Sequence, residues 1–297
     1  MPGPTPFADL NELMEDLAAR AQAILGADFV GAYLQGSFAL GDADEFSDCD
    51  FLVVARDTLS QEQEHAVRAL HAEIPDRDGR WCQLLQGSYA PATDLATNER
   101  IGTDWLYIGH GLREMRWSSH CNKVYHRWIL HERGIAIRGA PARQVVAPIP
   151  TELLRENARR QLPGLLEEVG SWAFPFRVAF TQRYLVATYC RILFIIAHGV
   201  VPSKPVALRW ALETLDPAWR PLLTQVLDDR PRGSDFSDRS RPGSIKASLR
   251  FGEYAVRLGD LDPATWSTVE AARIVATDRT VTGWLGSVAP AGTVTVE

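Results

Sequence analysis

The sequence lacks a long uninterrupted apolar run. Its longest apolar stretch, Tyr184–Val201, contains Arg191 and His198 and is therefore too polar to span a bilayer. The N-terminal residues MPGPTPFADLNELMEDL lack the basic segment followed by an apolar segment that marks a secretory signal. We therefore expect a cytoplasmic protein that does not associate with membranes.

Cysteine is scarce, and basic residues are outnumbered by acidic ones. The four cysteines form no CxxC pair and have no histidine at metal-ligand spacing, which argues against a disulfide framework and a structural zinc site. The net charge is −6, from 37 acidic and 31 basic residues. Because nucleic-acid binding needs clustered Lys and Arg, this balance argues against transfer to an RNA end and favours a small cationic or polyol substrate.

The 297 residues suffice for two domains. Up to about residue 148, helical and strand patterns alternate, as they do in a sheet domain with covering helices. The predicted helices cover residues 7–25 and 60–74, the latter with Ser60 as N-cap, and the predicted strands cover 28–35, 47–55 and 80–90.

The second half has a different pattern. From about residue 149 to residue 258 nearly every segment has helical periodicity, and Thr151 is a candidate N-cap for the first helix. A charged loop rich in Pro and Gly interrupts this pattern at residues 229–243 and is expected to be mobile. We predict domains at 1–148 and 149–297, and a monomer.

The stretch LQGSFALGDADEFSDCDFLVV, residues 34–54, carries the clearest chemical motif. Residues two apart on a strand share a face, so Asp48 and Asp50 project together while Cys49 points into the core. Two adjacent carboxylates repel each other unless a cation lies between them, and a divalent metal is the usual partner. Gly36 and Ser37 follow the preceding strand, where glycine permits close approach of a ligand and serine can act as an N-cap beside phosphate-binding amides.

This Gly-Ser and Asp-x-Asp combination resembles the signature of the nucleotidyltransferase superfamily with the DNA polymerase β-like fold. The resemblance implies an α+β protein, in which an N-terminal domain with a mixed sheet precedes a C-terminal α-helical bundle. It also implies that Gly36 and Ser37 bind ATP and that Asp48 and Asp50 are catalytic and bind Mg²⁺, with two ions expected. The family's reaction moves a nucleotidyl group to a hydroxyl, with pyrophosphate leaving.

Residues 183–223, RYLVATYCRILFIIAHGVVPSKPVALRWALETLDPAWRPLL, are similar to helices of aminoglycoside adenylyltransferases of the streptomycin/spectinomycin type. The similarity implies that Arg191 and Lys204 contact the ATP phosphates. An arginine in an otherwise apolar helix also favours an anionic partner on physical grounds. The implied function is ATP- and Mg²⁺-dependent transfer of AMP to a hydroxyl of an aminoglycoside or similar small polyol, in a cleft between the domains.

The sequence departs from this family at the general base. The family has a third carboxylate on the next strand, and here that position is Gln86, with Gln83 as the other possible register. Glutamine cannot accept a proton at neutral pH. Three explanations stay open: another base such as Asp104, His110 or a metal-bound hydroxide; a weakened or non-catalytic nucleotide binder; or an engineered Glu-to-Gln variant.

The substrate signals are mixed. The resemblance aligns Trp172 with a substrate-contacting tryptophan, but the acidic residue expected five positions later is Arg177. Asp104 and Trp105 are further candidates for lining the substrate cleft, with the indole stacking on a sugar ring. The three histidines His120, His126 and His131 are expected to be surface or core residues and not metal ligands, because no carboxylate cluster accompanies them.

Overall fold

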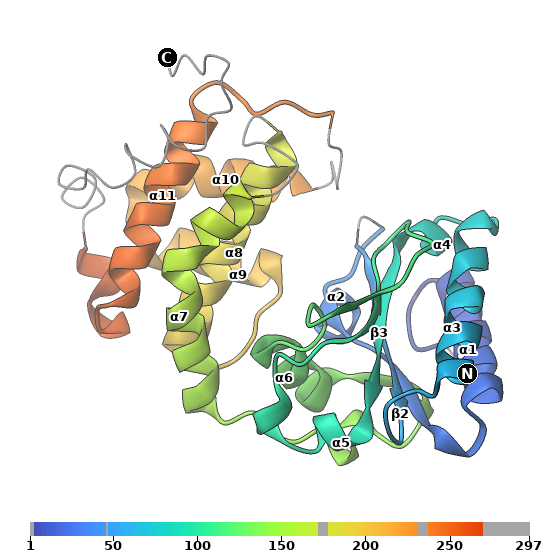
Figure 1. The fold of residues 1–297 in the computed structure, drawn as a ribbon. Coiled ribbons are helices and arrows are strands. Elements are labelled where there is room, and N and C mark those ends of the chain that lie inside the picture. Colours follow the sequence, from blue (N-terminus) through green and yellow to red (C-terminus); the bar gives the residue numbers. More distant parts are fainter. Residues whose placement is uncertain (1–2, 46, 172–177, 231–236, 270–297) are drawn as a thin grey trace. The chain divides into compact units, whose positions relative to one another are not determined.

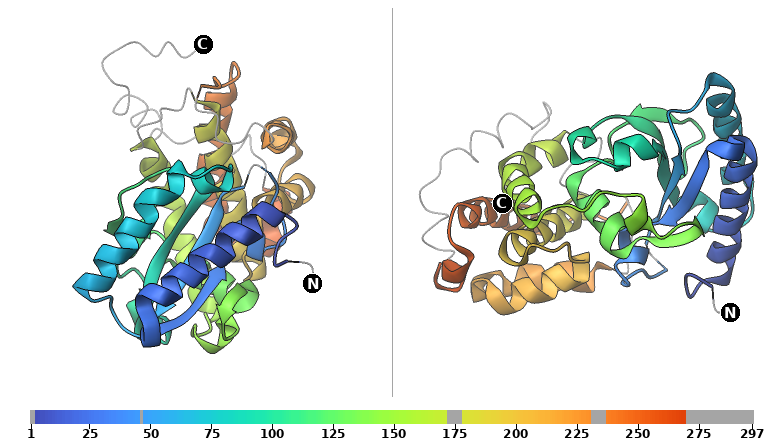
Figure 2. Two further views of the ribbon diagram at one scale, coloured as in Figure 1. Left: turned by 90° about the vertical axis from the view of Figure 1, so that its right-hand side faces the viewer. Right: turned by 90° about the horizontal axis from the view of Figure 1, so that it is seen from below.

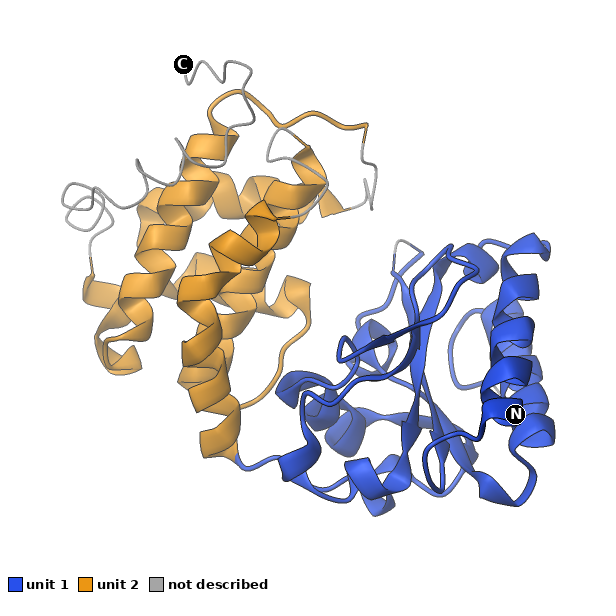
Figure 3. Cartoon of the chain, viewed as in Figure 1, with its two compact units in different colours: residues 1–150 blue, residues 151–297 orange. Residues whose placement is uncertain are grey.

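The computed structural model describes residues 3–45, 47–171, 178–230 and 237–269. The chain divides into two compact units, residues 1–150 and 151–297 (Figure 3). The domain boundary predicted between residues 148 and 149 stays a prediction. Trp172 and much of the loop predicted at 229–243 lie outside the described residues.

The first unit is built on a six-stranded sheet with the order β5-β4-β3-β2-β1-β6. Strands β2 and β3 run parallel, while the other neighbouring pairs run antiparallel. The strands are β1 Phe29–Leu34, β2 Cys49–Ala55, β3 Leu85–Pro91, β4 Trp105–Ile108, β5 Arg116–Ser118 and β6 Ile135–Gly139. This mixed sheet, followed by a helical second unit, confirms the predicted α+β class.

Two long helices cover one face of the sheet, as Figures 1 and 2 show. Helix α1, Ala8–Leu25, buries its predicted apolar stripe, and α3, Gln61–Glu73, starts with a capping box in which the Ser60 hydroxyl accepts from the Gln63 N–H. Both helices were predicted to within a residue or two. Cys49 points from β2 into this core and is 0% exposed, as predicted. Full burial of one leucine contributes about 1.5–3 kcal/mol, so the stripe of α1 fixes the helix on the sheet.

The opposite face packs under shorter helices. Leu52, Trp105 and Leu130 belong to this second core, which lies beneath α5, Ala92–Leu95, and α6, Val124–Arg133. Because side chains alternate along β2, Asp50 projects to this face, opposite Cys49. The short helix α2, Gly36–Ala39, follows β1 and contacts both β2 and α6.

One predicted strand begins later than expected. Residues predicted to start a strand at position 80 form the helical turn α4, Trp81–Leu84, and the strand starts at Leu85. The reason is the indole of Trp81, which is buried against the rings of Phe7 and Phe38 at centroid distances of 5.1 and 5.7 Å. This burial beneath α1 overrides the strand preference of the local sequence.

The second unit is helical. Helix α8 lies at its centre, in contact with α7, α9, α10 and α11. The helices are α7 Thr151–Gly170, α8 Ala179–His198, α9 Lys204–Thr214, α10 Arg220–Asp228 and α11 Ser244–Gly259, and 3₁₀ turns occupy Pro217–Trp219 and Pro263–Thr268. The first unit has 3₁₀ turns at Gly26–Asp28, Ile74–Asp76, Asn98–Arg100 and Ala142–Gln144. Thr151, predicted as an N-cap, is the first residue of α7. Within the described ranges, no helix has the length and hydropathy needed to cross a membrane.

Candidate active site

A carboxylate pair lies at the start of β2. Asp48 immediately precedes the strand and Asp50 is its second residue, and both side chains are partly exposed. Cys49 between them packs with its Sγ 3.7 Å from Met14 Sδ, on the other side of the sheet. Both carboxylates act on Tyr107: burial, with the negative charges of Asp50 and Asp48 adding to it, raises the pKa of this phenol well above its usual range. The phenol therefore stays protonated and can donate.

Gly36 packs its backbone directly against Asp50. A Cβ atom at position 36 would lie 1.9 Å from Asp50 Oδ2, and the φ angle of Gly36 is 61°, a value that other residues rarely adopt. The Gln35 N–H donates to the Asp50 backbone carbonyl at 2.9 Å, which holds the two segments together. A side chain here would displace the carboxylate, so the close approach requires glycine.

Ser37 is not the N-cap that the sequence predicted. It is the second residue of α2, and Gln35 occupies the capping position without a side-chain hydrogen bond to the helix. The prediction failed because the helix begins two residues earlier than a Ser37 cap would require, at Gly36. Ser37 still lies beside the glycine that contacts Asp50, with a partly exposed side chain.

Gln86 lies next to Asp50 because β2 and β3 pair in parallel with these two residues in register. The Gln86 amide N–H donates to Asp50 Oδ1 at 2.7 Å, and the Tyr107 hydroxyl donates to Gln86 Oε1 at 3.4 Å. Only the nitrogen end of an amide can donate to a carboxylate, so these partners assign the orientation of the amide. Gln83, the other predicted register, is on α4 and donates to the Pro75 carbonyl instead.

Basic and aromatic side chains surround Tyr107, the last residue of the hydrogen-bonded series Asp50, Gln86 and Tyr107. The His120 ring packs on the Tyr107 ring at 4.9 Å, and the Arg116 guanidinium lies 5.7 Å from the centre of the same ring. His126 lies 6.0 Å from His120. Sequence reasoning missed Tyr107 because it did not predict β4, although the run WLYI between two glycine-containing turns was a signal for that strand.

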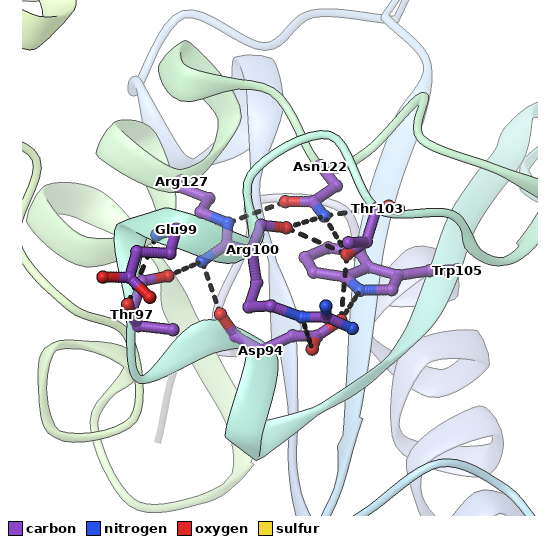
Figure 4. Close-up of polar contacts among 8 residues, drawn as sticks. All are labelled: Asp94, Thr97, Glu99, Arg100, Thr103, Trp105, Asn122 and Arg127. Atoms are coloured by element: carbon purple, nitrogen blue, oxygen red, sulfur yellow. Dashed lines mark hydrogen bonds and ion pairs between the residues drawn. The ribbon is translucent and has the colours of Figure 1, made fainter.

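Asp104 and Trp105 are not brought to the carboxylate pair. Strand β4 pairs antiparallel with β3, so Trp105 lies near the end of β3 while Gln86 lies near its start. Trp105 is 1% exposed, and its indole N–H donates to Asp94 Oδ2 at 3.0 Å (Figure 4). This burial leaves no ring face for a sugar, so the geometry does not support the predicted stacking role. His110, the other proposed base, is exposed in the turn after β4.

Asp94 anchors a buried polar network at that far end. Arg100 and Thr103 donate to it at 3.0 Å each, besides Trp105, and the Arg127 guanidinium lies 5.4 Å from the Trp105 ring centre (Figure 4). Burial opposes ionisation of Asp94, but the hydrogen bonds from Trp105, Arg100 and Thr103 hold its pKa below the usual range. The network joins α5, β4 and α6, and the Asp94 carboxylate is satisfied within the fold.

In the second unit, Arg191 and Lys204 lie near the same tyrosine. Arg191 Nε donates to the Pro202 carbonyl at 3.2 Å, and the Lys204 ammonium lies 5.3 Å from the centre of the Tyr184 ring. Burial raises the pKa of Tyr184, and the positive charge of Arg191 partly opposes this shift. The two cations predicted to bind phosphate therefore occupy one region of this unit.

The carboxylate pair fits a metal ion that is shared with a ligand. Mg²⁺ is commonly bound by one or two carboxylates together with substrate phosphates and water. In the part of the chain that the structure describes, no three His, Cys, Asp or Glu side chains gather to hold a metal by themselves. Asp48 and Asp50, both partly exposed and with the Gly36 backbone against Asp50, fit a site of the shared kind.

Two protein families match the chain. The nucleotidyltransferase domain family matches residues 22–102, and the C-terminal domain family of aminoglycoside adenylyltransferases matches residues 144–240. A spectinomycin 9-adenylyltransferase from Campylobacter jejuni is 23% identical over 215 residues, which cover 69% of this chain and 79% of that protein.

A solved structure shows the same fold. The spectinomycin adenyltransferase of Enterococcus faecialis, crystallised with ATP and spectinomycin, superposes with a TM-score of 0.62 at 14% sequence identity. The superposition covers 82% of this chain and 96% of the other. The two family matches include both segments quoted above: residues 34–54 lie in the match to the nucleotidyltransferase domain, and residues 183–223 lie in the match to the C-terminal domain of aminoglycoside adenylyltransferases.

Proposed function

We propose that this chain, which joins a nucleotidyltransferase domain to an aminoglycoside adenylyltransferase C-terminal domain, transfers AMP from ATP to a hydroxyl group of an aminoglycoside. Spectinomycin is the first acceptor to test, because the similar proteins from Campylobacter jejuni and Enterococcus faecialis are both named for it. The acceptor hydroxyl attacks the α-phosphorus of ATP and pyrophosphate leaves.

The observation that carries the proposal is the contact between Gly36 and Asp50. Backbone without a side chain lies against the carboxylate of Asp50, two residues after Asp48 at the start of β2. The missing side chain makes room for the Asp50 carboxylate itself, and the partial exposure of Asp48 and Asp50 leaves both within reach of phosphate oxygens. When bound there, Mg²⁺ would neutralise phosphate charge and polarise the α-phosphorus. Asp48 and Asp50 would hold it.

The remaining roles follow the chemistry of the side chains. The Ser37 hydroxyl can donate to a phosphate oxygen, and the cations Arg191 and Lys204 can offset the charge of the triphosphate. Gln86 has a different role from a base, because its amide N–H donates to Asp50. We assign to it the positioning of the Asp50 carboxylate.

A protein that binds ATP without efficient transfer is the second candidate. The absence of a carboxylate at position 86 favours it, since loss of a general base typically costs about 10²–10⁴ in rate. This candidate shares the ATP and metal site and differs only in the transfer step.

Calorimetry and a transfer assay separate these functions. ATP is titrated into the protein with MgCl₂ present, and α-labelled ATP is then incubated with spectinomycin, streptomycin and further aminoglycosides. Transfer of label to an acceptor supports the proposal, and ATP binding without transfer supports the second candidate. No ATP binding would contradict both. Asp50→Asn is the control for metal-dependent transfer, because it keeps the side chain's size and removes its charge.

A further inference from the structure

The proposed transfer requires a group that accepts the proton of the acceptor hydroxyl. Gln86 cannot do so, because it has no basic atom and its amide donates to Asp50. Asp48 and Asp50 are assigned to the metal ion. A protein base for the transfer would therefore come from an element other than β3.

His120 lies along the line of side chains that begins at Asp50. Gln86 contacts Asp50 at 2.7 Å, Tyr107 contacts Gln86 at 3.4 Å, and the His120 ring packs on Tyr107 at 4.9 Å with an angle of 41° between the planes. The backbone N–H of His120 donates to Ser118 Oγ at 3.2 Å, which holds the turn after β5 in place. The imidazole is thus held beside the residues that border the carboxylate pair.

The imidazole is also available. His120 is exposed, and among the described residues neither of its ring nitrogens takes part in a hydrogen bond or ion pair. His126 differs, since its Nδ1 is buried. His120 is therefore the more exposed histidine of this group, and a hydroxyl from solvent can reach its ring.

The surrounding charges favour the neutral imidazole. Contact with its neighbours removes water from the ring and lowers the pKa of His120, and the positive charges of Lys123, Arg116 and His110 lower it further. These groups come from the N-terminus of α6, from β5 and from the turn after β4, while Tyr107, His126 and the two aspartates face the same region. At neutral pH the ring is in the form that accepts a proton.

We propose that His120 is the general base for the transfer and replaces the carboxylate that is missing at position 86. This inference rests on the proposed function. The hydroxyl oxygen forms a bond to the α-phosphorus, the bond from that phosphorus to the oxygen of pyrophosphate breaks, and the hydroxyl proton moves to an imidazole nitrogen of His120. Pyrophosphate leaves with the electron pair, and the imidazolium then loses its proton to solvent.

The test compares three single variants with the wild type. His120→Gln keeps a polar side chain of similar size but cannot accept a proton, His110→Gln removes the competing base, and His65→Gln alters an exposed histidine on α3, which covers the opposite face of the sheet. We expect kcat to fall by about 10²–10⁴ in His120→Gln alone, as is typical for loss of a general base. ATP affinity measured by calorimetry with Mg²⁺ is expected to stay unchanged in all three.

Two further readouts separate a base from a structural residue. The acidic limb of the kcat/KM pH profile should be present in the wild type and absent in His120→Gln, and added imidazole should restore part of the rate of His120→Ala. An unchanged kcat in His120→Gln, or a loss confined to His110→Gln, would overturn the inference while leaving the proposed function intact. A wild type that binds ATP but transfers AMP to no acceptor would instead refute the proposed function, and the inference with it.

Discussion

The two ends of the sheet in the first unit each hold a carboxylate beside β3, and the chain surrounds the two differently. Asp94, near the end of β3, is 7% exposed and is enclosed by donors from Trp105, Thr103 and Arg100. Asp50, beside the start of β3, is partly exposed, and its carboxylate lies against the Gly36 backbone, where a Cβ atom of residue 36 would otherwise be.

We propose that this difference distinguishes a structural carboxylate, Asp94, from a functional one, Asp50. Asp94 receives its hydrogen bonds from three side chains of its own fold, and its lowered pKa reports that stabilisation. Asp50 accepts from Gln86, packs against the Gly36 backbone and stays partly exposed, so a ligand can reach it. Composition alone does not separate them, because each is an aspartate beside a short helix at a strand end. The surroundings of each carboxylate do separate them, because donor side chains enclose Asp94, whereas the backbone of a glycine lies against Asp50.

Asp50→Asn tests the functional end and carries the largest expected effect. Removing the charge should lower kcat/KM for AMP transfer by about 10³ or more, equivalent to roughly 4 kcal/mol of transition-state stabilisation, since metal ligation contributes several kcal/mol. Urea unfolding should show a stability change within about 0.5 kcal/mol, as for substitutions away from the core. A stability loss of the same size as the activity loss would show that Asp50 is structural instead.

Lowering the pH should destabilise the protein through a histidine on the face of the sheet opposite both carboxylates. His71 is buried there, stacked on Phe51 at 5.4 Å and hydrogen-bonded to the Tyr89 hydroxyl at 3.0 Å. Burial, with the charge of Arg20 adding to it, lowers the pKa of His71 to about 3. The unfolded chain therefore takes up a proton on this histidine between pH 6.5 and 3, whereas the folded chain does not.

Stability should thus be complete above pH 6.5 and fall as the pH drops toward 3. The expected loss from this group between pH 7 and pH 4 is about 3 kcal/mol, at 1.36 kcal/mol per pH unit. Urea unfolding at several pH values measures it, with His71→Gln as the non-titrating comparison. Equal slopes for the wild type and His71→Gln would show that other groups cause the acid sensitivity.

Much of the first unit was predictable because its signals are local. The apolar stripe of α1, the Ser60 cap of α3 and the inward position of Cys49 each follow from spacings within one element. The place of Asp50 at the start of β2, on the face opposite Cys49, was predictable for the same reason, since side chains alternate along a single strand.

The rest depends on pairing between distant segments. Asp104 and Trp105 were predicted to line the substrate site, but the antiparallel register of β4 carries them to the end of the sheet occupied by Asp94. The same register brings Tyr107 to Gln86, which sequence reasoning missed. Strands of three or four residues have too little periodicity to reveal such pairing.

Asp94→Asn tests the structural end. The variant replaces one carboxylate oxygen of Asp94 with an amide NH₂ group, which cannot accept a hydrogen bond from the donor that it faces. Loss of the negative charge also weakens the remaining hydrogen bonds to this side chain. We expect a stability loss of about 2 kcal/mol, the range for hydrogen bonds to a charged group. Urea unfolding measures the loss, and the ATP affinity of the folded variant should equal that of the wild type. Loss of ATP binding without loss of stability would reverse the assignment of the two ends.

Tyr107→Phe tests how the functional end is held and has the smallest expected effect. The variant keeps the ring that packs on His120 and removes only the hydroxyl that donates to Gln86. Without that bond the amide can rotate and present its oxygen to Asp50, so the carboxylate loses a donor for part of the time. We expect kcat/KM to fall about fivefold, equivalent to the roughly 1 kcal/mol of one hydrogen bond.

A double-mutant cycle with Gln86→Ala shows whether the hydroxyl acts through the amide. If it does, Tyr107→Phe will have no further effect on kcat/KM once Gln86 is alanine, because the group that it orients is gone. Full additivity of the two changes would mean that Tyr107 acts on the reaction without Gln86. The hydrogen bonds from Tyr107 to Gln86 and from Gln86 to Asp50 would then not be energetically coupled. The position of Gln86 beside the carboxylate would need a different explanation.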